Sequence, residues 1–419
     1  MSRRIVIIGG GVIGLCTAYY CARSGFKVIV VEREPARRDG CSFGNAGMIV
    51  PSHFVPLAAP GAVFLALKWM WNPASPFYLK PRLDRELLDW GFKFWRAANA
   101  VHVRRAAPLL RDLAFASRAL FEELSQLPLT DFGLAKKGLL MLCREPHILE
   151  EEARTAAQAR VLGIPAEVLD AKGTAELDPG ASLQIAGAVY FPKDCHLAPD
   201  RFVSTLQTQL EKLGVQNIWN QEVVDWRIQN GRQIRAAILS DGKEIEAEEF
   251  VLCGGVWSPI LSRKLGLKIP TQAGKGYTLT LTQPRQLPHL CSILTEARVA
   301  VTPMGQNLRV GGTMEIAGLN HDVNPVRVRG IVDAFCRYFP GFNPPDFEGI
   351  RPWCGLRPCS PDGLPYLGRT ERFHNLSIAA GHAMMGMTLG PVTGKLISEI
   401  LSTGKPSLDI TLLSPDRYH

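Results

Sequence analysis

The chain has 419 residues, yet none of its apolar runs approaches the roughly 18 residues that a bilayer-spanning helix needs. Its most apolar segment, Phe64–Trp71, is far shorter, and we expect it to form a helix packed inside the protein. We also expect no N-terminal secretion signal. These absences predict a cytoplasmic protein and leave open peripheral contact with the inner face of the membrane.

Paired cysteines are missing as well. The ten cysteines are scattered singly along the chain, which predicts reduced thiols rather than a disulfide framework. Cys354 and Cys359 lie on a proline-rich segment, but neither a second pair nor a cluster of histidines accompanies them. A structural zinc site needs four such ligands, so we expect no metal.

Clustered charge is the third absence. The formal net charge is +8, which could attract nucleic acid or anionic lipid. However, the basic residues gather only in pairs such as Arg37-Arg38 and Arg104-Arg105. Such diffuse charge is typical of a solvated surface, so we expect no nucleic-acid partner.

The N-terminal segment has a clear α/β pattern. Ile5–Ile8 is a short apolar run, Val12–Ser24 has helical apolar spacing that ends before Gly25, and Phe26–Val31 is a second strand. A strand, a helix and a strand within about 30 residues predict parallel pairing through a crossover.

Further along, helical and strand patterns alternate in blocks. The expected helices are two within Leu83–Leu127, one over Pro199–Leu213 and one over Gly390–Leu401. In the first of these, Leu87, Leu88, Gly91, Phe94 and Trp95 are expected to share one face. The expected strands are several short ones within Val215–Ala247, then Glu249–Cys253, Tyr277–Leu281, Val299–Thr302, Leu308–Val310 and Leu376–Ala380.

This order predicts an α/β protein with two domains. The first is a discontinuous Rossmann-like domain for a dinucleotide, and the second is an α+β domain built on an antiparallel sheet. The expected boundaries are residues 1–50, 198–270 and 350–419 for the first domain, and 51–197 and 271–349 for the second.

The turn after the first strand carries the chemistry of a dinucleotide site. Gly9, Gly11 and Gly14 fit the GxGxxG pattern, which provides a tight turn, close approach of the backbone to a pyrophosphate, and helix-to-strand packing. Glu32 ends the second strand, where a carboxylate can bind a ribose hydroxyl and disfavours a 2′-phosphate.

Three later segments favour FAD over NAD. The loop Ser42–Met48 has small residues that let backbone lie near a flat ring and its ribityl chain. The strand ending at Cys253 runs into Gly254-Gly255, a second glycine approach to a long cofactor. Ala380–Gly386 precedes the expected C-terminal helix, whose N-terminus could stabilise negative charge on the flavin N1–C2=O edge.

These motifs resemble the family of D-amino acid oxidases, glycine oxidases and sarcosine oxidases, and particularly the bacterial D-amino acid dehydrogenases. The resemblance runs through four stretches in order: Ile7–Gly14 with Glu32, Ser42–Gly47 with Ala58–Gly61, Gly355–Gly368, and Gly381–Leu389. It implies a flavoprotein in which the flavin N5 accepts hydride from the α-carbon of a small amino acid. Residues 62–190 match only loosely, and we expect them to shape substrate choice.

The resemblance implies specific roles for individual residues. Arg357, in a Gly-Leu-Arg-Pro motif, would bind the substrate carboxylate, because a guanidinium holds a carboxylate with two hydrogen bonds. Tyr277 and His53 are further candidates for the substrate site, although a core tyrosine is as well supported and a structural histidine is favoured at positions 53, 196 and 382. The expected cofactor-binding residues are Gly9, Gly11, Val12, Ile13, Gly14, Glu32, Arg33, Ser42, Asn45, Ala46, Gly47, Met48, Val223, Gly254, Trp257, Gly381, His382, Met384, Gly386, Met387 and Thr388.

Several alternatives stay open at this point. Some relatives attach the flavin to a cysteine, and Cys354 lies next to the aligned position, where Gly355 stands, so non-covalent FAD is expected. The substrate could instead be a secondary amine or imino acid such as sarcosine, proline or hydroxyproline, or a hydroxy acid. A non-catalytic FAD-bound subunit and a tRNA-modifying flavoprotein are less favoured. The electron acceptor, quinone or oxygen, cannot be read from the sequence.

Overall fold

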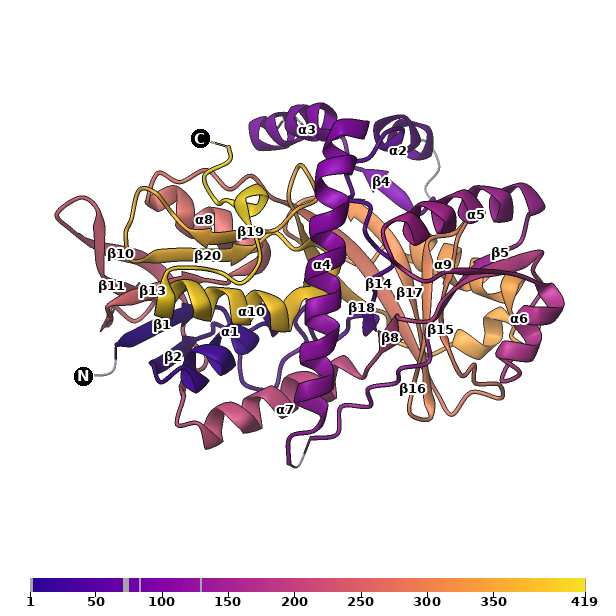
Figure 1. Ribbon diagram of the computed structural model, residues 1–419, viewed down its shortest axis with the longest axis horizontal. Helices are drawn as coiled ribbons and strands as arrows, with labels where there is room; N and C mark the ends of the chain where they lie inside the picture. The colour runs from indigo at the N-terminus through magenta and orange to yellow at the C-terminus, as the bar shows by residue number, and fades with distance from the viewer. Residues whose placement is uncertain (1–2, 71–74, 83, 129, 419) are drawn as a thin grey trace.

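The protein is built around two large sheets that lie side by side (Figure 1). The computed structural model describes residues 3–70, 75–82, 84–128 and 130–418. Of the apolar segment named above, Trp71 lies outside the described residues.

The first sheet has six strands in the order β19-β20-β13-β1-β2-β9. Strands β1 and β2 pair in parallel on either side of the helix α1, as the sequence predicts. Their near-continuous apolar sequences suit a parallel sheet that is covered by helices on both faces. The bounds are β1 Arg4–Ile8, α1 Val12–Arg23, β2 Lys27–Val31, β9 Gln216–Ile218, β13 Glu249–Leu252, β19 Tyr366–Arg369 and β20 Leu376–Ala380.

A small antiparallel sheet replaces a crossover helix between β9 and β13. It has the order β10-β11-β12 and forms the projecting corner at the left of Figure 1. Asn230 and Gly231 both have positive φ in the turn between β10 and β11, which agrees with the predicted Asn-Gly hairpin. The bounds are β10 Val223–Gln229, β11 Gln233–Leu239 and β12 Glu244–Glu246.

The second large sheet has nine strands and is mostly antiparallel. Its order is β18-β14-β17-β16-β15-β5-β7-β6, with β4 paired to β17. The bounds are β4 Phe77–Leu79, β5 Leu139–Cys143, β6 Glu167–Asp170, β7 Gly187–Phe191, β14 Gln272–Thr282, β15 Cys291–Leu294, β16 Val299–Met304, β17 Asn307–Ile316 and β18 Trp353–Cys359.

One strand crosses the domain boundary expected at residue 350. β18, which carries Arg357, pairs with β14 in the second sheet, although the sequence-based division assigns residues 350–419 to the cofactor domain. Because the chain then returns to β19 and β20 in the first sheet, β18 lies at the junction of the two sheets. The division into domains stays a proposal.

Helices pack against both large sheets (Figure 1). The long helix α4 contributes Leu113 and Phe121 to the same core as β1, α1, α7 and α10. A separate core lies under α9, where Phe335 packs against the second sheet. The bounds are α2 Ala62–Met70, α3 Arg85–Ala97, α4 Ala100–Ser125, α5 Pro146–Val161, α6 Ala171–Leu177, α7 Pro199–Lys212, α8 Ser258–Lys264, α9 Pro325–Tyr338 and α10 Gly386–Thr403.

Helix α3 corrects one expectation about a shared apolar face. Leu87 and Trp90 are buried, and the Trp90 Nε1 donates to the carbonyl of Cys359 at 2.8 Å. Leu88 and Trp95, expected on the same face, are instead 63% and 61% exposed. Apolar residues that occur all around a helix do not indicate which stripe faces the core, and here the anchor to β18 decides it.

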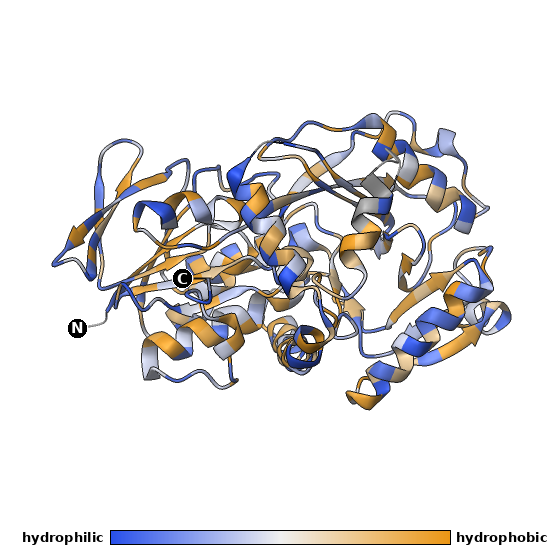
Figure 2. Cartoon of the chain, turned by 90° about the horizontal axis from the view of Figure 1, so that it is seen from above, coloured by the Kyte–Doolittle hydropathy of each residue, from blue (hydrophilic) through white to orange (hydrophobic). Residues whose placement is uncertain are grey.

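Helix α2 also differs from the interior helix expected for this segment. Its Phe64 is 73% exposed, while Ala62, Val63 and Leu65 line a cavity inside the protein. α2 and α3 form the upper surface in Figure 1, which Figure 2 views from above. Among the described residues, no helix is both long and apolar enough to traverse a bilayer.

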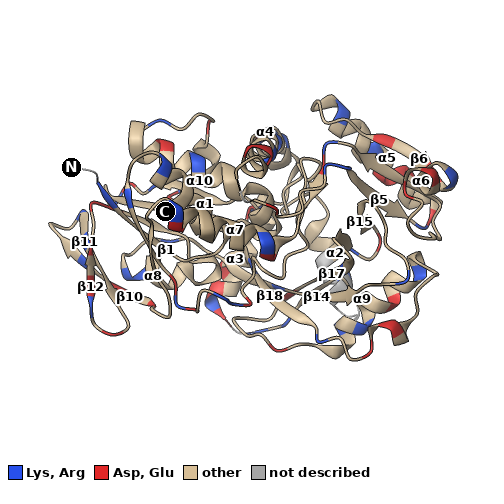
Figure 3. Cartoon of the chain, turned by 90° about the horizontal axis from the view of Figure 1, so that it is seen from below, with Lys and Arg blue, Asp and Glu red and all other residues tan. Residues whose placement is uncertain are grey.

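The surface charge is mixed in sign. In Figure 3, Lys and Arg alternate with Asp and Glu over the helices and loops of that view, without a continuous basic face. Many of these charges form exposed pairs, such as Arg263 with Glu86 at 2.7 Å and Arg235 with Glu246 at 2.9 Å. The net positive charge is therefore spread over the molecule.

Candidate functional site

A cavity of about 1240 Å³ runs between the two sheets. One end lies at the turn after β1 and the end of β2, and the other is bounded by β14, β17 and β18 together with α2 and α3. Its volume exceeds that of ordinary small-ligand pockets, which reach roughly 1000 Å³. It is therefore large enough for a long cofactor together with a small substrate.

The glycine turn has the geometry that each of its three positions requires. Gly9 has φ +106°, and a Cβ there would lie 2.5 Å from the Cys253 carbonyl oxygen. A Cβ on Gly14 would lie 1.8 Å from the Gly9 oxygen, so this glycine allows α1 to pack on the turn. At Gly11 a Cβ would meet only the Ser42 Oγ, at 3.4 Å, and would point into the cavity. The free space at Gly11 fits a pyrophosphate.

The end of β2 presents a carboxylate to the cavity. The Gly10 N–H donates to Glu32 Oε2 at 2.7 Å, and the Glu34 N–H donates to Oε1 at 3.0 Å. These bonds hold the carboxylate where a ribose would lie. The neighbouring Arg33 guanidinium lies 3.7 Å from the centre of the Trp257 ring, and both residues line the cavity.

Arg38 is a cavity residue that the sequence analysis assigned to a solvated basic pair. Its guanidinium donates to the Gly10 carbonyl and lies over the rings of Phe43 and Trp219, at 5.3 and 5.0 Å. Burial lowers the pKa of Arg38, while Glu32 opposes that shift. Its place just after the strand that ends in Glu32 was the signal available in the sequence.

The loop Ser42–Met48 is tied to both sheets. Ser42 Oγ accepts the N–H of Val12 at 2.9 Å, at the start of α1. From β17, the Arg309 Nη1 donates to the carbonyls of Phe43 and Asn45, at 3.2 and 2.8 Å. The loop that we expected near the flavin is therefore held in place by a partly buried arginine of the second sheet.

The C-terminal motif forms the start of α10, which begins at Gly386 rather than near Gly390. A short 3-10 turn over Ala383–Met385 precedes it. Gly390 lies inside the helix, and its lack of a side chain allows α10 to pack closely on α1. A Cβ on Gly390 would lie 3.1 Å from Val12 Cγ2. The residues His382, Met384, Gly386 and Met387 therefore reach the cavity at the helix N-terminus.

Arg357 lies on β18 at the other end of the cavity. Its Nη1 donates to the Thr313 carbonyl at 2.9 Å. The side chain lies over Gly276 of the neighbouring strand β14, where a Cβ would lie 2.2 Å from Nη1 and 2.5 Å from Nη2. In the described part of the chain no carboxylate pairs with this guanidinium, so it is available to a carboxylate in the cavity.

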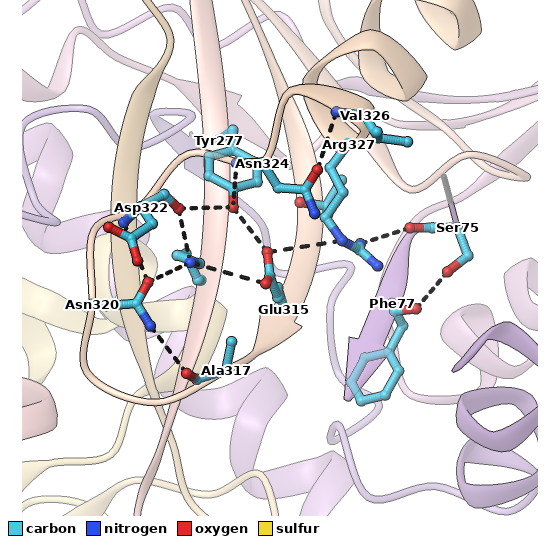
Figure 4. A network of polar contacts seen from close by, with 12 residues as sticks. Ser75, Phe77, Tyr277, Glu315, Ala317, Asn320, Asp322, Asn324, Val326 and Arg327 are labelled. Carbon is cyan, nitrogen blue, oxygen red and sulfur yellow. Dashed lines mark hydrogen bonds and ion pairs between the residues drawn. The ribbon is translucent and has the colours of Figure 1, made fainter. Parts of the chain in front are cut away.

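Tyr277 lies outside the cavity, in contrast to its expected place at the substrate site. It is fully buried, and its hydroxyl donates to Glu315 at 2.8 Å (Figure 4). Lys275 and Arg327 join the same network through Glu315, at 4.0 and 3.8 Å. Alternation along β14 explains the difference, since Thr278 lines the cavity and Tyr277 points to the opposite face.

His53 and His382 both line the cavity, whereas His196 does not. Burial lowers the pKa of His382 to about 3, and its Nε2 lies 3.0 Å from the Thr393 Oγ1. Burial also lowers the pKa of His196 to about 4. These two imidazoles are neutral at neutral pH.

Most expected site residues meet around this one cavity. Those that line it are Arg357, His53, Gly9, Gly11, Val12, Ile13, Glu32, Arg33, Ser42, Asn45, Ala46, Met48, Val223, Gly254, Trp257, His382, Met384, Gly386 and Met387. The expected residues Tyr277, Gly14, Gly47, Gly381 and Thr388 do not line it. Gly47 and Thr388 shape its wall indirectly, because Gly47 packs under the Leu197 oxygen and Thr388 Oγ1 donates to the Met48 carbonyl.

Cys354 does not line the cavity and instead packs at the edge of the core under α9. The ten cysteines are all free. Within the described ranges, no group of three His, Cys, Asp or Glu side chains is arranged to hold a metal ion.

The arrangement matches a known family. The family model described as "FAD dependent oxidoreductase" matches residues 4–400. The chain belongs to this family. It is 32% identical to a D-amino acid dehydrogenase of Rhizobium rhizogenes, over 99% of this chain and 100% of that protein. It is 30% identical to a D-amino acid dehydrogenase of Helicobacter pylori, over 99% of both chains.

The fold is also that of a solved structure. A glycine oxidase from Geobacillus kaustophilus superposes with a TM-score of 0.78 over 100% of both chains, at 24% identity. This likeness agrees with the expected α/β fold. The identity is too low for the likeness to indicate the substrate.

Proposed function

We propose that this flavoprotein oxidises the C–N bond of a small amino acid, and that it is a D-amino acid dehydrogenase. The observation that carries the proposal is Arg357, whose guanidinium faces the family's FAD cavity and has no carboxylate partner among the described residues. The similarity to dehydrogenases of D-amino acids over almost the whole chain supports the stereochemical assignment.

The residues present fit FAD. Gly11 and the start of α1 would bind the pyrophosphate, and Glu32 would bind the ribose. The loop Ser42–Met48 would lie beside the flavin ring. When bound, FAD supplies the hydride acceptor. We propose non-covalent attachment, because Cys354 packs toward the second core rather than the cavity.

The chain's own residues would orient the substrate and exclude water. Arg357 holds the carboxylate with two hydrogen bonds, which fixes the direction of the α-hydrogen. Apolar side chains around the same end, such as Phe77, Phe94 and Met314, keep the site dry. In this setting a charge-assisted pair is stronger than in water.

We further propose a quinone as acceptor and peripheral contact with an anionic membrane. Leu88, Phe92 and Trp95 recur at helical spacing on the outer face of α3 and are 63%, 56% and 61% exposed. Arg85 and Arg96 on the same helix are exposed as well, and so are Arg104 and Arg105 on α4. The inner faces of α2 and α3 line the cavity, which supports entry of an apolar acceptor from this side.

The decisive experiment is anaerobic mixing of the purified yellow protein with D-amino acids, L-amino acids and cyclic imino acids while flavin absorbance is followed. Bleaching by D-amino acids, with little by the others, is the expected outcome. Faster bleaching by proline or sarcosine would assign the enzyme to secondary amines instead. Absence of bleaching by any substrate would favour a non-catalytic subunit.

A further inference from the structure

A buried carboxylate reaches the cavity through two side chains. Strands β3 (Met48–Ile49) and β8 (Cys195–His196) pair antiparallel, which brings Ser52 next to Asp194. The Ser52 N–H donates to Asp194 Oδ1 at 3.1 Å, and the Ser52 hydroxyl donates to Oδ2. The same hydroxyl oxygen lies 3.1 Å from His53 Nδ1.

The number of protons that each group can donate sets the direction of the hydrogen bonds between His53, Ser52 and Asp194. The Ser52 hydroxyl has one proton, which it gives to Asp194, so its oxygen accepts the Nδ1–H of His53. A neutral His53 then has a free lone pair on Nε2. Because Ser52 and His53 both line the cavity and Asp194 does not, the chain connects the cavity to an interior acid.

The surroundings of Asp194 favour uptake of a proton by its carboxylate. It is fully buried, and in the part of the chain that the structure describes it forms no ion pair. Arg118, the charged side chain that acts on it from α4, pairs with Glu122 at 2.8 Å. A buried carboxylate without a cation gains by taking up a proton.

We propose that Asp194, Ser52 and His53 form a proton relay that removes a proton from the ammonium group of the bound amino acid. The inference rests on the proposed function, since it assigns the substrate's amine to the His53 side of the cavity. Hydride can leave the α-carbon only when the nitrogen lone pair is free to form the imine. The relay therefore prepares the reactive form of the substrate.

The step balances without any redox partner. An N–H bond of the ammonium breaks as the Nε2–H bond of His53 forms. The Nδ1 proton passes to Ser52 Oγ, whose own proton passes to Asp194 Oδ2. One proton moves from the substrate to Asp194, and the substrate remains as the neutral amine.

The surroundings are consistent with transfer near neutral pH. Burial raises the pKa of Asp194 to about 7, against the two hydrogen bonds from Ser52 and the charge of Arg118. The thiols of Cys195 and Cys291 face it and stay neutral, because burial raises the pKa of each. Burial and Arg298 lower the pKa of His53 to about 4, so His53 passes the proton on. Arg298 in turn interacts electrostatically with Glu152 on α5.

The test is the pH profile of anaerobic flavin reduction by a D-amino acid, measured on the FAD-loaded enzyme. In the unmodified enzyme the apparent second-order rate should rise through about pH 7. In Asp194→Asn the rise should move up to the pKa of the substrate's own amine. Each pH unit below that pKa costs about tenfold in free amine, so the loss at pH 7 should be tenfold or more and should vanish at high pH.

Two further variants and a control show whether the effect is specific to the relay. Ser52→Ala breaks the relay but keeps the backbone bond to Asp194, and His53→Gln removes the cavity end, so both should show the same upward shift. Asp178→Asn is the matched control, because Asp178 is also a buried carboxylate that accepts backbone N–H groups, from His289 and Leu290. It lies outside the cavity and should leave the profile unchanged.

Unchanged rates at pH 7 in Asp194→Asn and Ser52→Ala would overturn the relay, and so would an equal loss at every pH, which would indicate a structural role. A failure of the proposed function would look different, because then the unmodified enzyme would not be reduced by amino acids at any pH.

Discussion

Two arginines lie on the strands on either side of β14, and they have different partners. Arg357 on β18 is available to substrate, whereas Arg309 on β17 donates to the carbonyls of Phe43 and Asn45. Both are partly buried, so removing either guanidinium leaves polar groups without a partner. We nevertheless expect the loss of Arg357 to weaken substrate binding and the loss of Arg309 to weaken FAD binding.

Arg357→Met should retain FAD and the fold but lose about 2–5 kcal/mol in kcat/KM toward amino acids, mostly as weaker binding. The carboxylate is desolvated in the site, and no neighbouring dipole fully replaces a guanidinium. Arg357→Lys should recover only part of the loss, because it keeps the charge but not the two-pronged geometry. Reductive half-reaction kinetics with an amino acid and with the amine lacking its carboxylate would measure this.

Arg309→Met is the matched control for that experiment. It should weaken FAD binding, because the loop Ser42–Met48 loses its anchor to the second sheet. FAD released on dilution would report this effect. If Arg357→Met slowed both the amino acid and the amine equally, the carboxylate assignment would be incorrect.

At the scale of an element, the β1–α1 turn separates cofactor binding from folding. Gly11→Leu should give folded protein with little FAD, because the protein leaves room for a Cβ where the pyrophosphate would lie. Gly14→Ala should instead lower the free energy of unfolding by about 1–3 kcal/mol, since its Cβ would clash with the Gly9 oxygen. Flavin absorbance and thermal unfolding, measured side by side, distinguish the two. Full FAD content in Gly11→Leu would show that the turn is misassigned.

The exposed apolar residues on the outer face of α3, here called the α3 stripe, provide a second prediction at this scale. Changing Leu88, Phe92 and Trp95 together to Ser should reduce co-sedimentation with anionic vesicles by at least about tenfold, because apolar burial and charge both contribute to binding. Val161→Ser is the control, since Val161 is 88% exposed on α5 and belongs to no such stripe.

Vesicles without anionic lipid should bind less of the unmodified protein, because the basic residues near the stripe then lose their partner. Equal binding by the triple variant would remove α3 from the contact. A dimer that dissociates in the triple variant, with no vesicle binding in either protein, would identify a second copy as the occupant.

At the scale of the whole molecule, we propose that the cavity between the sheets serves both half-reactions. We expect turnover with a quinone or an artificial dye to exceed turnover with oxygen, since the similar proteins are dehydrogenases. Steady-state rates with dye, quinone and air-saturated buffer would be compared, with hydrogen peroxide measured in parallel. Peroxide formed at the dye-supported rate would make the enzyme an oxidase.

The glycine turn, Glu32, the antiparallel strands and the hairpin at Asn230 were predictable because each depends on a local period or a short motif. Arg357 was identifiable only through the family resemblance, since no local pattern distinguishes an arginine on an exposed strand edge from one facing a cavity. Only the fold shows that its guanidinium faces the cavity and that no carboxylate of the described residues pairs with it.

What the sequence by itself determined is the order of elements and the dinucleotide motif, because these depend on residues a few positions apart. The tertiary structure decided which face of each element meets the cavity. A period of two along β14 predicts that Tyr277 and Thr278 point in opposite directions, but strand pairing sets which of them reaches the site. Asp194 meets Ser52 across 142 positions of the chain, a contact that only the pairing of β3 with β8 creates.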